Sequence, residues 1–94
     1  MRKFGTDKPE FLVFQLEGSE KIYKLPLSAS MPAAQLLAMQ EAYSKGTESA
    51  FKFQIEFLRK NIGKIADTLT AATVGEIFTA WSEESNKQGA GPGE

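Results

Sequence analysis

The sequence contains no cysteine and no histidine, and these two absences remove several classes of functional site. Without cysteine there is no disulfide framework and no zinc–thiolate site, although this absence does not assign a cellular compartment. Without histidine the chain lacks the commonest general base and the commonest metal ligand. We therefore expect no metal site and no cofactor, in a chain that is poorly equipped for catalysis.

The chain also lacks an excess of either charge and lacks long apolar runs. Its 11 Lys and Arg residues oppose 12 Asp and Glu residues, so the net charge of −1 gives no electrostatic reason to expect binding to nucleic acid or to a membrane. No apolar run reaches the length of a membrane span, and no signal-peptide core follows the basic start of the chain. At 94 residues the sequence predicts one small, soluble, intracellular domain.

The acidic and hydroxyl residues do not form a catalytic pattern. Asp7 and Asp67 are the only aspartates and stand far apart in the sequence, and Glu83 and Glu84 are neighbours that diverge on a predicted helix. A serine nucleophile would need a lysine or a terminal amine as its base, because the chain has no histidine. We therefore predict that the protein is not an enzyme.

Residues 11–26 predict a β-hairpin. The segment 11–16 is rich in aromatic and branched side chains, and Gly18-Ser19 suits a two-residue type II′ turn because glycine accepts a positive φ at its first position. This turn places apolar residues opposite one another on one face of the hairpin. The predicted pairs are Leu12 with Leu25 and Phe14 with Tyr23.

Three helices are predicted after the hairpin, at about 32–44, 47–62 and 74–86. A serine of the Ser28–Ser30 segment and Thr47 are predicted caps for the first two helices, and Gly63 is predicted to end the second. Thr73 and Glu76 have the spacing of a capping box for the third. Its apolar stripe consists of Val74, Ile77, Phe78 and Trp81, and a core position is the favoured interpretation of Trp81 over a binding role.

The order of these elements predicts the fold class and the boundaries of the domain. A hairpin followed by three helices is an α+β fold that is predominantly helical. Residues 1–10 mix charges with glycine and proline and are predicted to form a flexible arm, while residues 87–94 are glycine-rich and are predicted to be a disordered tail. Residues 11–86 are then a single domain.

The predicted second helix has two apolar ridges. Phe51, Ile55, Leu58 and Ile62 follow the spacing of a buried stripe, whereas Phe53 and Phe57 project from nearly the opposite side. Two interpretations of the second ridge remain open, because the helix either runs through the middle of the fold or exposes a binding ridge. In the second case Phe53 and Phe57, flanked by Lys60, are the candidate partner-binding residues, and they would suit apolar helical segments of a partner or self-association.

Basic residues on the same helix do not indicate a nucleic-acid site. Lys52, Arg59, Lys60 and Lys64 lie on or near it, but Glu56 lies within the same strip and pairs with lysines four residues away. Arginine, the preferred reader of guanine and phosphate, occurs only twice in the chain. A solvated helix face is the favoured interpretation.

The order of these segments resembles the small tail assembly chaperones of long-tailed bacteriophages and prophages. The segments that carry the resemblance are Tyr23-Lys24-Leu25-Pro26, Ser30-Met31-Pro32, the Phe-rich stretch 51–58 and the closing stretch 76–85 with Trp81 and Ser85. The Tyr-x-Leu-Pro and Trp-x-x-x-Ser patterns are the most useful of them. The resemblance covers most of residues 11–86.

The resemblance implies a function that needs no cofactor or ATP. Chaperones of this family bind the long, helical tape-measure protein in the cytoplasm of the bacterial host, keep it soluble, help recruit tail-tube subunits and are absent from the mature virion. It also implies a longer product made by frameshifting, to which the tail after Lys87 would form the linker. The alternatives are a small structural component of the tail, such as a connector or tube subunit, and another protein-interaction domain.

Overall fold

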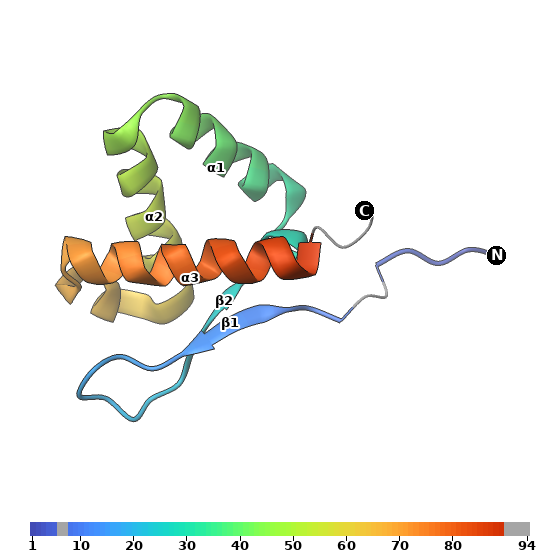
Figure 1. Ribbon diagram of the computed structural model, residues 1–94. Helices are drawn as coiled ribbons and strands as arrows, with labels where there is room; N and C mark the ends of the chain where they lie inside the picture. The colour runs from blue at the N-terminus through green and yellow to red at the C-terminus, as the bar shows by residue number, and fades with distance from the viewer. Residues whose placement is uncertain (6–7, 90–94) are drawn as a thin grey trace.

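The computed structural model describes residues 1–5 and 8–89 and shows an antiparallel two-stranded hairpin followed by three α-helices (Figure 1). The strands are β1 (Phe11–Phe14) and β2 (Tyr23–Pro26), and the helices are α1 (Ala33–Ser44), α2 (Thr47–Ile62) and α3 (Ala71–Gly89). Two 3₁₀ helices, Ser28–Ser30 and Gly63–Thr68, lie in the connections. The predicted α+β, predominantly helical fold class is confirmed.

The hairpin has the predicted register but a different turn. Leu12 lies opposite Leu25 and Phe14 lies opposite Tyr23, as the apolar pattern requires. The Ser19 N–H donates to the Leu16 carbonyl at 3.0 Å, so the turn is centred on the two residues before Ser19. Gly18, with φ +80°, is the third residue of this turn rather than the second. The predicted Gly18-Ser19 type II′ turn is therefore wrong. The register is nevertheless the predicted one, because it is determined by the apolar residues that share one face of the hairpin.

The first two helices begin without the predicted side-chain caps. Pro32 and Gly46 occupy the N-cap positions of α1 and α2, and neither helix has a side-chain cap. Ser28 and Ser30 instead support tertiary contacts, because the Ser28 N–H donates to Ser85 Oγ at 3.1 Å and Ser30 Oγ accepts from the backbone of Glu10 at 2.7 Å. The capping predictions are wrong here: the Ser30 hydroxyl accepts from Glu10 instead, and Pro32 and Gly46 occupy the N-cap positions.

Helix α3 begins earlier and ends later than predicted. Thr70 Oγ1 accepts the Thr73 N–H at 3.1 Å, so Thr70 caps the helix and the capping box of Thr73 and Glu76 does not form. Residues 87–89, assigned to a disordered tail, are helical, and 90–94 lie outside the described residues. Of the predicted N-terminal arm, residues 1–5 and 8–10 are exposed and lie outside helices and strands.

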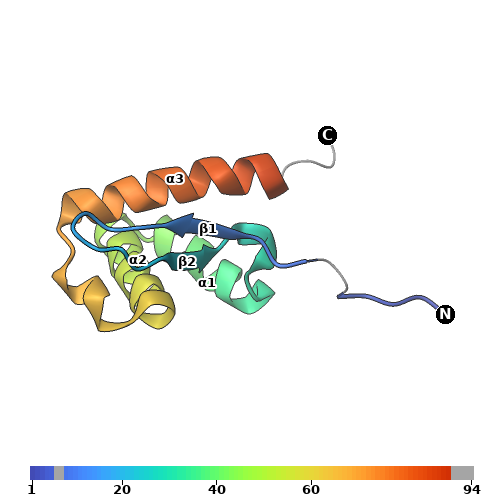
Figure 2. The same cartoon turned by 90° about the horizontal axis from the view of Figure 1, so that it is seen from below.

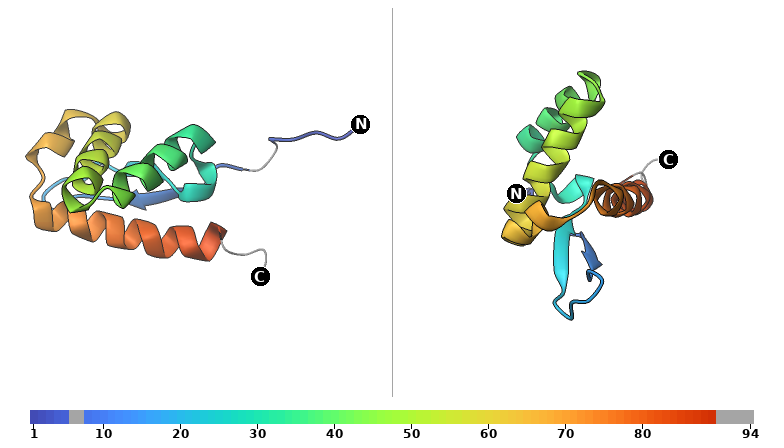
Figure 3. Two further views of the ribbon diagram at one scale, coloured as in Figure 1. Left: turned by 90° about the horizontal axis from the view of Figure 1, so that it is seen from above. Right: turned by 90° about the vertical axis from the view of Figure 1, so that its left-hand side faces the viewer.

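The helices pack on different parts of the hairpin. Helix α3 runs alongside it on the side of β1, while α2 packs against β2 (Figure 2). Helix α1 packs on α2, and these two helices lie on the other side of the molecule from α3 (Figure 3). Strand β1 therefore has β2 on one side and α3 near the other.

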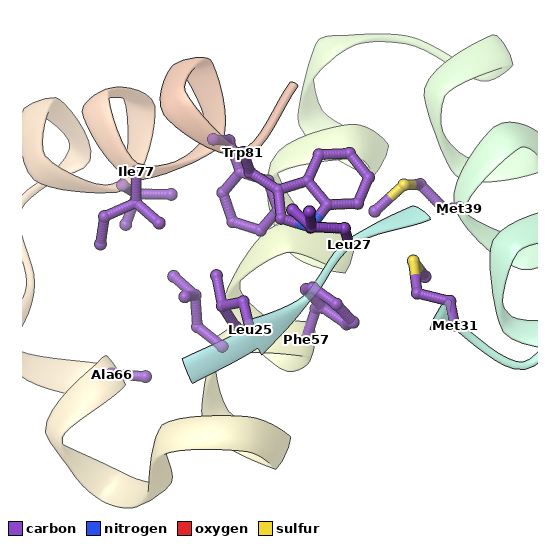
Figure 4. Packing of buried hydrophobic residues seen from close by; sticks show 11 residues of the cluster. Leu25, Leu27, Met31, Met39, Phe57, Ala66, Ile77 and Trp81 are labelled. Atoms are coloured by element: carbon purple, nitrogen blue, oxygen red, sulfur yellow. The ribbon is translucent and has the colours of Figure 1, made fainter. Parts of the chain in front are cut away.

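The core lies where β2, α2 and α3 meet (Figure 4). Its largest fully buried side chains are Leu25, Leu27, Phe57, Leu58 and Val74. The predicted α3 stripe is buried throughout, and Trp81 Nε1 donates to the Pro26 carbonyl at 2.8 Å. Trp81 is therefore a core residue that also ties α3 to the end of β2, as the favoured interpretation predicts.

Candidate functional site

The structure places the sequence-predicted site residues at different depths. Phe57 is only 2% exposed, and its ring lies 6.0 Å from that of Phe78 and 6.3 Å from that of Trp81. Phe53 is partly buried and stacks on Phe57 at 6.1 Å, while Lys60 is exposed. The sequence leaves open whether Phe53 and Phe57 lie in the middle of the fold or form an exposed binding ridge. Phe57 lies in the core, so the two residues do not form an exposed ridge.

The opposite ridge of α2 is exposed at its N-terminal end and buried further along the helix. Phe51 is 37% exposed and Ile55 is partly buried, although their spacing predicted a buried stripe. Leu58 is fully buried, and Ile62 packs partly against the core. Helix α2 is therefore turned so that Phe53, Phe57 and Leu58 face β2 and α3. The pattern of α2 alone contains both apolar ridges and does not show which one the rest of the fold covers.

A groove of about 610 Å³ lies between β1 and α3. Residues 12–17 of the hairpin form one wall, and the other wall comes from residues 68–70 and the first turns of α3. We name this hollow the β1–α3 groove. Its apolar lining consists of Leu12, Val13, Phe14, Leu16, Leu69, Ile77 and Ala80.

The residues of each groove wall follow the regular spacing of the element that carries them. Leu12, Phe14 and Leu16 alternate along the hairpin and pack partly against the core, so their remaining surface borders the groove. On α3, Thr73, Glu76, Ile77 and Ala80 have the i, i+3, i+4, i+7 spacing of one helix face. Sequence reasoning treated the hairpin residues only as core. The missed signal is that a two-stranded sheet leaves an edge of each strand without a partner strand.

The charged residues of the groove are both acidic. Glu17 and Glu76 line it, and its lining contains no lysine or arginine. Within the described part of the chain the ion pairs join Arg59 to Asp67 and Lys87 to Glu84, so neither groove glutamate has an ionic partner there. The groove thus combines apolar walls with negative charge.

Arg59 is paired within the fold. Its guanidinium donates to Asp67 Oδ1 at 2.7 Å, and this hydrogen bond together with the charge of Asp67 raises the pKa of the Arg59 guanidinium. Both side chains are about half exposed, so the pair is a surface ion pair. Of the four basic residues on or near α2, Arg59 is therefore paired with a carboxylate of the following 3₁₀ helix.

A smaller hollow of about 410 Å³ separates α1 from α3. Met39, Trp81 and Ser85 border it, and all three are buried residues of the fold. Tyr43 is 42% exposed at its rim and accepts a hydrogen bond from Gln54 Nε2 at 2.9 Å. The β1–α3 groove has the larger volume and the more continuous apolar lining, so it is the better candidate site.

Within residues 1–5 and 8–89, no group of three or more His, Cys, Asp or Glu residues is placed to hold a metal ion. In the same residues, no helix is both long and apolar enough to cross a lipid bilayer. Each buried side-chain nitrogen or oxygen there has a hydrogen-bond partner. The groove thus offers apolar contacts, two carboxylates, the Gln15 amide, three threonine hydroxyls and backbone groups.

Comparison with known protein-family models, curated proteins and solved structures gives no match for this chain.

Proposed function

We propose that the protein is a tail assembly chaperone of a bacteriophage or prophage, which binds apolar segments of the tape-measure protein. The proposal joins the resemblance of residues 11–86 to this family with the β1–α3 groove of the structure. The protein acts without chemistry in the host cytoplasm, helps recruit tail-tube subunits and is left out of the mature virion. These last features rest on the resemblance.

The observation that carries the proposal is the open apolar groove itself. A holding chaperone needs an apolar surface that a partner can enter and leave, and its binding keeps the partner away from aggregation. Leu12, Phe14, Leu16 and Leu69 are partly buried side chains whose remaining surface borders the groove. A groove of about 610 Å³ accommodates several side chains of a partner segment.

The direct test is co-expression with the tape-measure protein. The DNA from the Ser85 codon onward is sequenced first, because the proposal expects a slippery site, an overlapping frame and then the gene for a very long helical protein. That protein is then expressed alone and together with the chaperone. We expect the soluble fraction of the tape-measure protein to rise severalfold on co-expression, and the two proteins to copurify.

A matched pair of hairpin variants ties this effect to the groove. Leu16 lines the groove, whereas Ile22 is 60% exposed on the hairpin and lies outside the groove lining. We expect Leu16→Ser to lose the solubilising effect and Ile22→Ser to keep it, with both variants retaining the helical circular-dichroism spectrum.

Two outcomes would contradict the proposal. One is a tape-measure protein whose solubility does not change on co-expression with the wild-type chain. The other is recovery of this chain in stoichiometric amounts from purified virions, which would favour the alternative of a structural tail component.

A further inference from the structure

We propose that the β1–α3 groove binds an extended segment of the partner, which adds to the free edge of β1 as a third strand and carries lysine or arginine beside its apolar residues. This inference rests on the proposed function and specifies the form and chemistry of the bound segment.

The hydrogen-bond pattern of the hairpin shows which backbone groups of β1 are free. The Leu27 N–H donates to the Glu10 carbonyl at 2.9 Å. In an antiparallel pair, residues that exchange hydrogen bonds alternate with residues that do not. Leu12 and Phe14 therefore bond to β2, and the N–H and C=O of Val13 point away from it, toward the free edge of β1.

The groove runs along this edge. Val13 and Gln15 line it together with Leu12, Phe14 and Leu16, so both the inward and the outward residues of the strand border the same hollow. Such a lining is expected where a hollow follows the edge of a strand rather than one face. Helix α3 forms the opposite wall, where Ile77 and Ala80 line the groove.

An extended segment uses this geometry better than a helix does. It would pair its own backbone with the free groups of Val13 and direct every second side chain toward the apolar wall of α3, as in binding by β-strand addition. A helix has already satisfied its backbone groups internally and would leave those of Val13 unpaired. The free backbone edge therefore favours an extended occupant.

The charge of the groove determines the rest of the occupant's chemistry. Glu17 and Glu76 contribute two carboxylates, and no basic side chain in the lining offsets them. A segment with lysine or arginine next to apolar residues complements this pattern. A second copy of β1 does not, because Glu10 and Glu17 flank that strand and would bring further carboxylates to the groove.

The first test uses a fluorescent peptide of about eight residues that alternates valine with lysine, which is a common strand length. Its controls are the same peptide with glutamate in place of lysine, one with alternate backbone nitrogens methylated, and a cross-linked helical peptide of the same composition. We expect the valine–lysine peptide to bind at least about tenfold more tightly than each control.

Two variants at Val13 distinguish the contribution of its backbone N–H to peptide binding from that of its side chain. Val13→Pro removes the free N–H, and proline is tolerated on an edge strand whose N–H faces outward. Val13→Ala removes most of the side chain but keeps the N–H. We expect Val13→Pro to weaken binding of the peptide by about tenfold and Val13→Ala to weaken it by much less.

A second matched pair tests the charge. Glu76 lines the groove, and Glu83 is an exposed glutamate on the same helix outside the groove lining. Glu76→Lys should weaken binding of the valine–lysine peptide and improve binding of the valine–glutamate peptide. Glu83→Lys should change neither by more than about twofold.

The results distinguish this inference from the proposed function. Equal binding of the helical and extended peptides, or equal binding by Val13→Pro and Val13→Ala, would overturn the third-strand geometry. Tape-measure binding that survives Val13→Pro would overturn the inference and leave the chaperone proposal standing. Peptide binding as expected without any effect on the tape-measure protein would overturn the chaperone proposal alone, and dimerisation through β1 would show that a second copy is the occupant.

Discussion

Replacing Phe57 by alanine should destabilise the protein more than any other single truncation on α2. The side chain is 2% exposed and packs against the rings of Phe53, Phe78 and Trp81. Truncating a buried phenylalanine removes its transfer free energy and leaves a cavity, at a cost of about 3–5 kcal/mol. A domain of 94 residues has a total stability of roughly 5–14 kcal/mol, so this loss is a large part of it.

The assay is urea unfolding of wild type, Phe57→Ala and Phe51→Ala, followed by circular dichroism and by the fluorescence of Trp81. Phe51 lies on the same helix but is 37% exposed, so its truncation should cost only about 1 kcal/mol. The fluorescence of Trp81 reports on the core directly, because Phe57 is one of its ring neighbours. If Phe57→Ala proves too unstable to purify, Phe57→Leu provides a milder truncation at the same site.

The comparison has a clear contrary outcome. If Phe51→Ala costs several kcal/mol and Phe57→Ala leaves the unfolding midpoint unchanged, α2 faces the core with the other ridge. That result would return Phe53 and Phe57 to the surface as candidate partner-binding residues, and it would refute the orientation of α2 described above.

Four further substitutions test local features, each by the same urea titration. Thr70→Ala should lower the free energy of unfolding by about 1 kcal/mol because it removes a helix cap, while Glu76→Gln should leave it unchanged. A loss for Glu76→Gln and none for Thr70→Ala would instead support the predicted capping box. Ser85→Ala should cost about 1–2 kcal/mol because it leaves the Ser28 N–H without its partner, and no loss would show that this hydrogen bond is dispensable. Gly63→Ala should cost about 1–2 kcal/mol through its φ of +88° alone, since the space around it is open; a stabilised variant would contradict this backbone conformation.

The sequence predicts the elements of the fold well because each is encoded locally. The alternation of apolar residues determines the hairpin register that pairs Leu12 with Leu25. Glycines end the helical patterns near their true positions, with Gly63 as the C-cap of α2. The stripe of α3 that includes Trp81 has one apolar face, so its burial follows from the pattern alone.

What the sequence does not predict depends on contacts between distant segments. Helix α2 has two apolar ridges, and only the positions of β2 and α3 decide that Phe57 is buried and Phe51 is the more exposed. The hydroxyl of Ser30 has several suitable local roles, and its acceptance of the Glu10 N–H depends on the return of the chain to the hairpin. Local capping rules cannot distinguish these choices.

The candidate site was missed for the same reason. The wall residues Leu16 and Ile77 lie far apart in the sequence and line one groove only because α3 lies along the hairpin. The prediction of Phe53 and Phe57 as partner-binding residues depends on the spacing within one helix. A groove between two elements has no signature in either element alone.

Hydrogen exchange of the wild-type chain, measured by mass spectrometry with and without a bound fragment of the tape-measure protein, tests binding in the β1–α3 groove most directly. We expect slower exchange in residues 11–17, with the Val13 amide protected by the added strand, and in the first turns of α3. Protection confined to α1 and α2, with the exchange of β1 unchanged, would contradict binding in the β1–α3 groove.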